Sequence, residues 1–491
     1  MSELSTLVQR VWNYCHILRD DGVSYGDYLE QLTYLLFLKM AEEGGQIEAI
    51  PPELSWSSLI PLKGEALAGH YGHILAELGQ GTGLIATIFR QARNKITDPA
   101  KLERLLALID QDSWTGFGLD IKAAIYEGLL EKNAQDTKSG AGQYFTPRPL
   151  IQAIVEVMQP APGQCIADPA AGTGGFLLAA YDYILKQHGP LDPEQLHHLR
   201  HEALHGREIV DNTARLGVMN LYLHGISANS AASPISIGDS LLAAPGEQFD
   251  IVLTNPPFGK KGSVTFTPAA GETRRETQTI VRDDFWAATS NKQLNFVQHV
   301  KTLLKPGGRA AMVVPDNVLF EGGAGETIRR KLLHHTDMHT LLRLPPGIFY
   351  AQGVKANVLF FNAKPASERP GTEALWVYDL RTNQNFTLKQ KPLTRADLDD
   401  FVACFNPANR QERTATWSEA NPQGRWRCYR YEELLARDKA NLDIFWLGDH
   451  NLADPATQLD PDRLAVEIVE ELETALEEFR AMVVDEEEGL A

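Results

Sequence analysis

The residues with the most specific chemistry in this 491-residue sequence form the run Asn255-Pro256-Pro257-Phe258. They follow Asp250–Thr254, an apolar stretch that predicts a buried strand. The amino nitrogen of adenine is a weak nucleophile, because its lone pair is delocalised into the ring. Two oxygen acceptors directed at its hydrogens, the side chain of Asn255 and the backbone carbonyl of Pro256, favour a pyramidal and reactive geometry.

The two prolines fix this arrangement before a substrate binds. A proline restricts the residue before it to extended conformations, so Asn255 and Pro256 are held in one shape. Phe258 offers a flat face on which a base turned out of its duplex can stack. The alternative is an incidental turn at the end of a strand. The strand before these residues and the glycine-rich run upstream argue against it.

A second candidate site is the glycine-rich run DPAAGTGGF at 168–176, which follows the predicted strand Gln164–Asp168 and opens a predicted helix. Glycines at such a turn let the backbone approach a ligand that a Cβ would block, and ligands bind at this end of strands in doubly wound sheets. The run lacks the GxGxxG register, which disfavours a dinucleotide, and the chain has no GxxxxGK[ST], which disfavours an ATP motor.

Two carboxylates further along the chain extend this candidate pocket. Glu208 ends the next predicted strand, where an acid is expected to accept from ribose hydroxyls. Asp239 ends the element after it and is placed to accept from an adenine amino group. Either one alone would by default be a surface carboxylate. In chain order with the glycine-rich run, they indicate a nucleoside pocket.

The third motif, GQYFTPRPL at 142–150, precedes the first predicted strand. A Tyr-Phe pair beside a hydroxyl and an arginine can form the wall of a pocket and bind the carboxylate of a methionine moiety. The run also has the form of a loop–helix junction, in which Thr146 caps the helix and Pro147 takes its first position.

Around these motifs the chain divides into three regions. Residues 1–140 predict a helical N-terminal domain, because apolar residues recur at intervals of three and four. Residues 141–380 alternate short apolar strands with helices, which predicts an α/β domain with a doubly wound, Rossmann-like parallel sheet covered on both faces. The predicted strands are Gln164–Asp168, Leu204–Glu208, Asp250–Thr254, Arg309–Val314, His339–Leu344 and Asn357–Asn362, and the predicted helices are Gly175–Lys186, Asp211–Leu223, Leu294–Leu304 and Gly325–His334.

Residues 381–491 predict a linker followed by a helical C-terminal tail. An amphipathic helix at about 461–484 is expected either to join a core or to bind a partner, and the acidic run at 485–488 is typical of a solvated tail. Within the catalytic region, a long polar segment at 259–291 interrupts the sheet after the two prolines. Its basic residues are expected to contact phosphates: Lys260, Lys261, Arg274, Arg275 and Arg282.

Composition limits the class of protein. The chain carries 46 Lys and Arg against 64 Asp and Glu, a net charge of −18. A protein that holds DNA unaided normally has a basic face, so this charge indicates either clustered bases or a partner that supplies much of the grip, unless it serves solubility alone. The 4 cysteines are scattered and no stretch resembles a membrane span, so we expect a soluble cytoplasmic protein. The histidines between 188 and 205 lack a firm ligand spacing, and we expect no metal site.

Taken together, these motifs resemble the modification subunits of type I restriction-modification systems, which are DNA adenine-N6 methyltransferases. The resemblance covers most of the chain: the helical N-terminal domain, GQYFTPRPL, DPAAGTGGF, NPPFG, then VPDNVLF at 314–320 and LPPGIF at 344–349. It implies catalysis by Asn255, Pro256, Pro257 and Phe258. It implies that S-adenosylmethionine is bound by residues 143–148, Asp168, residues 173–175, Glu208 and Asp239.

The resemblance also implies partners. Family members join two modification subunits through one specificity subunit, act on double-stranded DNA, and associate further with a translocating restriction subunit. This chain fits that arrangement, because no segment after the predicted sheet is long and strand-rich enough to be an obvious target-recognition domain.

Three other functions fit parts of the same pattern. A methyltransferase acting on RNA, or on a protein glutamine whose side-chain amide suits the same acceptors, would use the same residues. A scaffold that binds cofactor and partners without catalysis would retain the glycine-rich run but would not need the intact Asn255 and Phe258.

Overall fold

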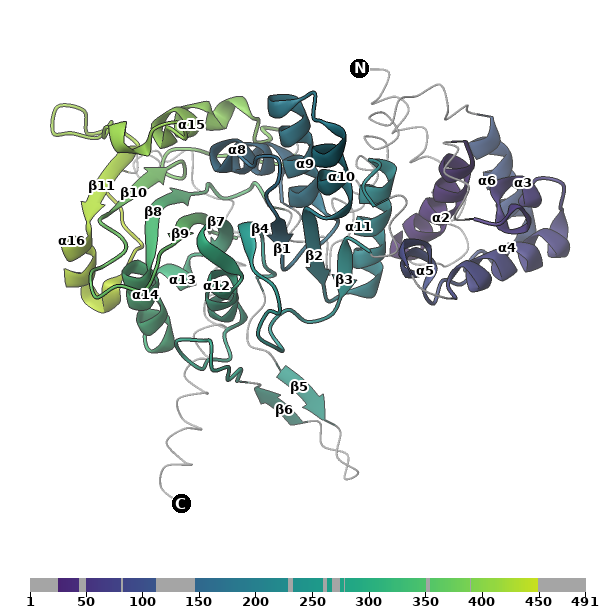
Figure 1. Cartoon of the computed structure of the whole chain (residues 1–491), viewed down its shortest axis with the longest axis horizontal. Helices are drawn as coiled ribbons and strands as arrows, with labels where there is room; N and C mark the ends of the chain where they lie inside the picture. Colours follow the sequence, from purple (N-terminus) through teal and green to yellow (C-terminus); the bar gives the residue numbers. More distant parts are fainter. Residues whose placement is uncertain are drawn as a thin grey trace, which may run out of the picture.

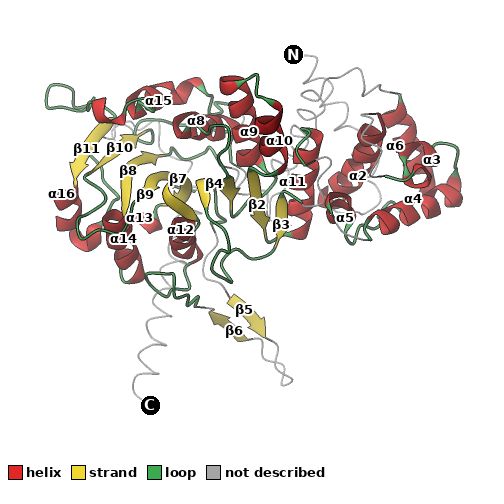
Figure 2. Cartoon of the chain, viewed as in Figure 1, coloured by secondary structure: helices red, strands yellow, loops and turns green. Residues whose placement is uncertain are grey.

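The computed structural model of the chain describes residues 25–43, 50–80, 83–111, 146–227, 233–258, 263–266, 274–277, 279–349, 354–388 and 390–448. Figure 1 shows a broad α/β body with a separate group of helices at one side. Figure 2 shows that the body is built on one sheet, with helices above and below it.

The group of helices at the side belongs to the N-terminal part of the chain. The first of these helices is buried all round over residues 30–41, and Leu32 and Leu36 are fully buried on it. The elements here are α2 (Tyr25–Glu43), η3 (Pro52–Leu54), α3 (Trp56–Leu59), α4 (Gly64–Leu78), α5 (Leu84–Phe89) and α6 (Pro99–Asp110). Asp98 caps α6 by accepting from the Ala100 amide at 2.9 Å.

The central sheet has nine strands within the described residues, in the order β11-β10-β8-β9-β7-β4-β1-β2-β3. Strand β9 is antiparallel to both of its neighbours and β11 is antiparallel to β10, whereas the other pairs are parallel. The strands are β1 (Ile166–Asp168), β2 (Leu204–Glu208), β3 (Ile235–Ile237), β4 (Phe249–Thr254), β7 (Leu304–Pro315), β8 (Thr336–Arg343), β9 (Ala356–Ala363), β10 (Ala374–Asp379) and β11 (Trp426–Arg430).

Strands β4, β8 and β9 are almost continuously buried because helices cover the middle of the sheet on both sides. On one side lie α8 (Arg148–Met158), α9 (Gly175–His188), α10 (Pro193–His201), α11 (Asp211–Leu223) and α15 (Asp399–Phe405), and on the other lie α12 (Lys292–Thr302), α14 (Ala324–His335) and α16 (Tyr431–Ala436) (Figure 1). Two short elements, α13 (Asn317–Phe320) and the hairpin β5 (Ser263–Phe266) and β6 (Arg274–Thr277), follow strands β7 and β4. The remaining 3-10 turns are η5 (Ala396–Leu398), η6 (Arg410–Glu412) and η7 (Asp438–Ala440).

The N-terminal helices dock on α11 at the β3 edge of the sheet. The Phe37 and Tyr222 rings lie with centroids 5.0 Å apart. Arg215 on α11 pairs with the Glu30 carboxylate at 3.0 Å and donates to the Arg90 carbonyl at 2.6 Å. Since Arg215 reaches two N-terminal segments, this contact fixes the helical group relative to the sheet.

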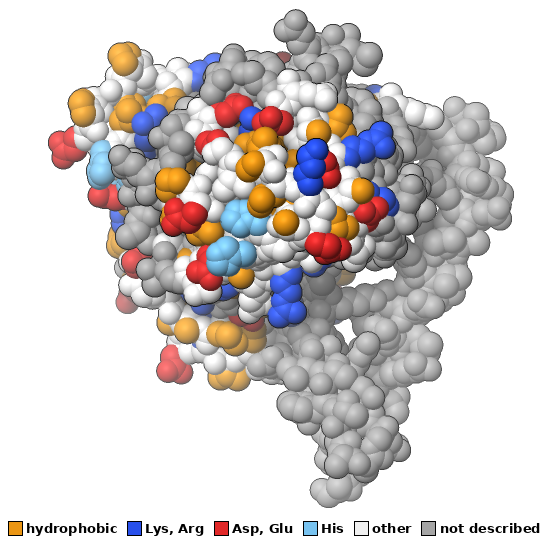
Figure 3. Space-filling view, turned by 90° about the vertical axis from the view of Figure 1, so that its right-hand side faces the viewer, with side chains coloured by type: hydrophobic (Ala, Val, Ile, Leu, Met, Phe, Trp, Pro, Cys, Tyr) orange, Lys and Arg blue, Asp and Glu red, His pale blue; other side chains and the backbone are white. Residues whose placement is uncertain are grey.

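The outward face of the N-terminal helices carries both signs of charge. Figure 3 shows acidic and basic side chains intermingled there among the residues drawn in colour. Lys63 lies 3.8 Å from Glu103, and His73 lies 3.9 Å from Glu77. The described part of this face is therefore not the basic surface that DNA phosphates require.

The fold class predicted from the sequence is confirmed: a helical N-terminal part and a doubly wound sheet of the Rossmann-like methyltransferase type. The predicted strand Leu204–Glu208 and helix Asp211–Leu223 have the observed bounds. The predicted tail helix at 461–484 lies outside the described residues. No helix in the described part of the chain is long and apolar enough to cross a membrane.

Two features of the sheet differ from the sequence prediction. A wholly parallel sheet was predicted, but β9 is antiparallel to both of its neighbours. The sequence did not reveal this, because an apolar run gives the same pattern in either strand direction. The sheet also extends past residue 380, where the sequence predicted the end of the catalytic domain, since β11 pairs with β10 and buries Trp426 completely.

Candidate active site

The glycine-rich run forms a tight turn between β1 and α9. Gly172 and Gly174 adopt left-handed backbone conformations, with φ of 53° and 80°. A Cβ built on Gly172 would meet no atom within 4 Å, so the space above this turn is open. Gly174 caps α9, and the amide groups at the start of this 14-residue helix face the same turn. The turn has the open, amide-lined form that a polar ligand requires.

Helix α11 holds this turn from below. Gly217 is required there, because a Cβ would lie 2.8 Å from the Gly172 carbonyl oxygen. Asn220, which is 1% exposed, donates from Nδ2 to the Thr173 carbonyl at 3.0 Å. Sequence reasoning missed Asn220, because a polar residue within a helix gives no local sign that it is buried.

Glu208 lies at the end of β2 beside the turn. Its Oε2 accepts from the Gly172 amide at 2.9 Å, and its Oε1 accepts from the Val210 amide at 2.9 Å. The carboxylate is thereby oriented, and each oxygen keeps a second lone pair for a ligand hydroxyl. The structure thus brings Glu208 to the glycine-rich turn, as the sequence predicted.

Asp168 joins the turn to the Asn-Pro-Pro-Phe strand. Its side chain is 2% exposed, and its Oδ1 accepts from Thr254 Oγ1 at 2.7 Å and from the Ala170 amide at 3.0 Å. Burial raises the pKa of Asp168 to about 7, although both hydrogen bonds act in the opposite direction. Since β1 and β4 are adjacent, the last residue of β4 contacts the glycine-rich segment directly.

Asn255 follows β4 immediately and contacts the third motif. Its Nδ2 donates to Thr146 Oγ1 at 2.8 Å across 109 residues of sequence. The donated bond fixes the plane of the amide and identifies Oδ1 as the oxygen that can accept from a substrate amino group. Pro256 is buried, Pro257 is exposed and Phe258 is half-buried.

The start of α8 differs from the sequence prediction in detail. We predicted Thr146 as the cap and Pro147 as the first helical residue, but the helix begins at Arg148, with Pro147 in the cap position and Pro149 in the first turn. The hydroxyl of Thr146 is used by Asn255 instead. Burial lowers the pKa of Arg148 to about 10, with Asp182 acting against that shift, so its guanidinium is charged at neutral pH. Gln143, Tyr144 and Phe145 lie outside the described residues.

Asp239 lines a cavity of about 390 Å³ together with Asp168 and Arg207. The cavity lies beside residues 238–248, which connect β3 to β4 without a helix, and His299 of α12 also lines it. The side chain of Asp239 accepts from the Leu241 amide at 2.9 Å. Asp239 and Asp168 therefore line one cavity, but the residues lining it do not include Glu208 or the glycine-rich turn at 172–175.

Ile209 is an exposed apolar residue that sequence reasoning did not single out. It follows Glu208 at the end of β2 and is 57% exposed. The sequence feature that could have drawn attention to Ile209 is its position directly after Glu208, the predicted ribose-binding acid.

Phe258 meets a second aromatic ring that comes from a different loop. Its ring centroid lies 5.9 Å from that of Phe349, with the planes at 72°. Phe349 is 3% exposed and belongs to the connection from β8 to β9. The LPPGIF run, noted in the sequence only through a resemblance, thus lies beside the Asn-Pro-Pro-Phe run.

Arg282 is buried and paired within the chain, which argues against the phosphate contact expected from the sequence. Its side chain is 6% exposed and pairs with Asp284, and its Nη1 lies 3.1 Å from His299 Nδ1. Burial and the Arg282 charge lower the pKa of His299 to about 3. Arg282 therefore fastens the segment after β6 to α12. The side chains of Lys260, Lys261, Arg274 and Arg275 lie outside the part of the structure described at side-chain level.

Known proteins match this chain over most of its length. Residues 118–422 match the N-6 DNA Methylase family and residues 7–49 match the HsdM N-terminal domain. The type I restriction enzyme StySPI methylase subunit of Salmonella potsdam is 41% identical, over 97% of this chain and 94% of that protein. The EcoKI methylase subunit of Escherichia coli strain K12 is 40% identical over the same shares.

Solved structures give the same result. The crystal structure of the EcoKI M protein has a TM-score of 0.55 at 37% identity, covering 96% of this chain and 94% of that one. A chain from a type I R-M system has a TM-score of 0.71 at 26% identity, with 98% of each chain covered.

The sheet and the residues at its carboxyl edge define a Rossmann-like methyltransferase. The chain belongs to the N-6 DNA methylase family, among the type I restriction enzyme methylase subunits. It is an adenine-specific DNA methyltransferase.

Proposed function

We propose that Asn255 Oδ1 and the Pro256 carbonyl oxygen each accept a hydrogen bond from the target adenine amino group, and that Phe258 stacks on the flipped base. The observation that carries this proposal is the pair of contacts on either side of β4's end: Thr254 to Asp168 at 2.7 Å, and Asn255 to Thr146 at 2.8 Å. These contacts with Asp168 and Thr146 support a position of the acceptors close to the glycine-rich segment.

The methyl donor that fits this turn is S-adenosylmethionine. The open space above Gly172, the oriented Glu208 carboxylate and the Asp239 side chain suit a nucleoside. We propose that Asp168 and residues 173–175 contact its amino acid part together with residues 143–148. Glu208 would bind its ribose, and Asp239 and Ile209 its adenine. When bound, this cofactor supplies an activated methyl group whose sulfur leaves as a neutral thioether, so no metal ion is needed.

The residues of the chain contribute position rather than covalent chemistry. Thr146 holds the Asn255 amide in one plane, and Pro257 restricts the backbone of Pro256. The amino nitrogen of the base is then aligned with the methyl group, and such alignment accounts for a large share of the rate.

We further propose that two copies of this chain assemble with one specificity subunit on double-stranded DNA in the cytoplasm, and that a translocating restriction subunit can join them. The net charge of −18 supports this, because an acidic chain gains from a partner that supplies part of the DNA grip.

The test is methylation by the complex of this chain with its specificity subunit. Asn255→Ala is expected to bind S-adenosylmethionine normally in calorimetry and to lose transfer of a tritiated methyl group to DNA. The exposed Asn421, far from the site in sequence, gives a matched control as Asn421→Ala. An active Asn255→Ala enzyme would refute the proposed role. Label appearing in RNA or protein in place of DNA would refute the substrate.

A further inference from the structure

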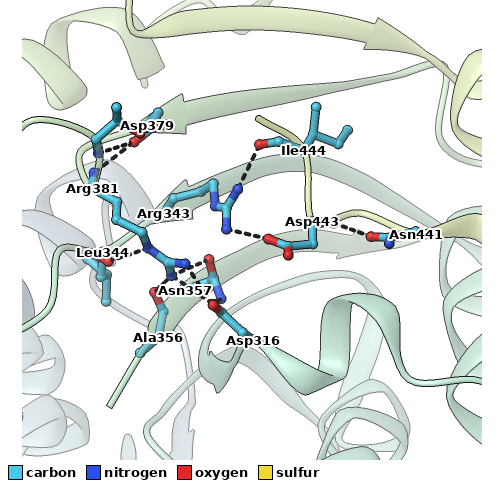
Figure 4. Close-up of polar contacts among 11 residues, drawn as sticks. Asp316, Arg343, Leu344, Ala356, Asn357, Asp379, Arg381, Asn441, Asp443 and Ile444 are labelled. Atoms are coloured by element: carbon cyan, nitrogen blue, oxygen red, sulfur yellow. Dashed lines mark hydrogen bonds and ion pairs between the residues drawn. The ribbon is translucent and has the colours of Figure 1, made fainter. Parts of the chain in front are cut away.

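A buried polar cluster lies at the carboxyl edge of the sheet, outside the residues to which a role has been assigned so far (Figure 4). Its centre is Arg381, which follows β10 and has a side chain 11% exposed. Arg381 donates from Nη1 to Asp316 Oδ2 and from Nη2 to Asp316 Oδ1, both at 2.7 Å. Asn357 Nδ2 donates to the same Asp316 Oδ1 at 2.7 Å. The fork of Arg381 is therefore held in one orientation by a bidentate ion pair.

The same guanidinium also binds two backbone carbonyls. Its Nε donates to the Leu344 carbonyl at 3.0 Å, and its Nη2 donates to the Ala356 carbonyl at 3.1 Å. Leu344 directly follows β8 and Ala356 begins β9. The Leu344 amide donates to the Ala356 carbonyl at 3.0 Å, so these two residues close the base of one loop. Arg381 thus fastens both ends of the loop at 345–355 to Asp316 on the β7 side.

That loop carries Phe349, the ring that packs against Phe258 at 5.9 Å. The segment that follows β10 and contains Arg381 also packs against this loop. Gly347 has a φ of 79°, and a Cβ there would lie 2.1 Å from the Phe386 carbonyl oxygen. The loop and the segment after β10 are therefore in van der Waals contact, and little freedom is left between them.

The backbone before Arg381 is fixed as well. Asp379, which is 1% exposed, accepts from the amides of Arg381 and Thr382, each at 2.8 Å. This turn directs the Arg381 side chain back across the ends of β8 and β9. A lysine could not replace it, because one ammonium group cannot bind a carboxylate with two parallel bonds and two separate carbonyls.

We propose that Arg381 is a positioning residue for DNA methylation, which sets the place of Phe349 and through it the Phe258 face on which the target adenine stacks. The inference rests on the proposed role of Phe258. Beyond that role, it assigns the positioning of the base-pocket wall to Arg381, which lies about 120 positions after Phe258 in the chain. Arg381 touches neither substrate nor cofactor in this account.

The test uses the complex with the specificity subunit and two DNA duplexes. One has 2-aminopurine at the target adenine and gives the fluorescence signal, and the other is unmodified and gives kcat, because 2-aminopurine lacks the 6-amino group that is methylated. This base fluoresces more when it leaves the stack, so fluorescence reports the flipped base. Arg381→Lys is expected to reduce the fluorescence change and to lower kcat at least roughly tenfold, while KM for S-adenosylmethionine changes less than about twofold. Asp316→Asn, which keeps the carbonyl contacts of Arg381, is expected to give a smaller loss in the same direction.

Arg425 provides a matched control. It also lies beside the end of β10 and donates to two backbone carbonyls, those of Asp379 at 2.7 Å and Thr382 at 2.9 Å, but it contacts neither end of the loop. Arg425→Lys is expected to lower thermal stability without a selective change in the fluorescence signal. If Arg381→Lys behaves like Arg425→Lys, Arg381 is only structural and the proposal is overturned.

A third variant separates this inference from the proposed function. If Phe349→Ala impairs base flipping and turnover but Arg381→Lys and Asp316→Asn do not, the positioning role alone is refuted. If Phe349→Ala leaves both readouts unchanged, the loop is not a wall of the base pocket and the positioning role is overturned with it, whereas the assignment of Asn255 is tested separately.

Discussion

Asp168 makes the stability of this protein depend on pH in an unusual direction. Burial raises its pKa from 3.8 to about 7 in the folded chain. A raised carboxyl pKa means that the folded state prefers the protonated form. The stability that the protonated Asp168 carboxyl contributes is therefore fully present below about pH 4 and is lost as the pH rises through about 7. The replacement Asp168→Asn keeps the size of the side chain and mimics the neutral form.

The expected magnitude follows from this shift. At about 1.4 kcal/mol per pKa unit, the full penalty for ionising Asp168 is on the order of 4 kcal/mol, of which roughly 3 kcal/mol develops between pH 5 and pH 8.5. Asp168→Asn is therefore expected to exceed the wild-type melting temperature by only roughly 1–2 °C at pH 5 and by roughly 4–5 °C at pH 8.5.

The assay is thermal unfolding of wild type and Asp168→Asn without cofactor at both pH values. Asp316→Asn is the control with the opposite sign. Burial alone would raise the pKa of Asp316, but its hydrogen bonds to Arg381 and the Arg381 charge hold it below the ordinary value. That variant should be less stable than wild type at neutral pH, and the difference should shrink as pH falls toward 4. Parallel pH profiles for wild type and Asp168→Asn would refute the buried, proton-binding Asp168.

Three further results are expected. Thr146→Val removes the acceptor that orients Asn255 and should lower kcat roughly tenfold, with recovery in Thr146→Ser, as measured by methyl transfer at saturating cofactor. Asn220→Ala removes the bond to the Thr173 carbonyl and should weaken S-adenosylmethionine binding by roughly 1–3 kcal/mol in calorimetry, and unchanged affinity would contradict the role of α11. Replacing Lys260 and Lys261 by Ala should reduce the slope of log affinity for DNA against log salt by about 2 if both contact phosphates, and an unchanged slope would remove that hypothesis.

Several helices and strands that position the site could be predicted from the local pattern of apolar residues. Other strands were missed, because their sequences carry no such pattern. β2 and α11 had the predicted bounds, because a short apolar strand and an amphipathic helix are local properties. The three-residue β3 is too short to give a pattern. β10 and β11 were missed because their pairing depends on residues about 50 positions apart, as in Trp376 and Cys428.

The sequence by itself determined the chemistry of this protein. Rigid acceptors at Asn255 and Pro256, a glycine-rich turn at 172–175 and an acid at Glu208 are properties of residue type and spacing. They restrict the backbone locally, and they do so whatever the rest of the chain folds into.

Only the tertiary structure decided how these residues act together. The contact of Thr146 with Asn255, the proton affinity of Asp168 and the hold of Arg381 on the Phe349 loop all depend on distant strands meeting at one edge of the sheet. Burial and long-range hydrogen bonds are set by packing, and packing is not encoded in any short stretch of residues.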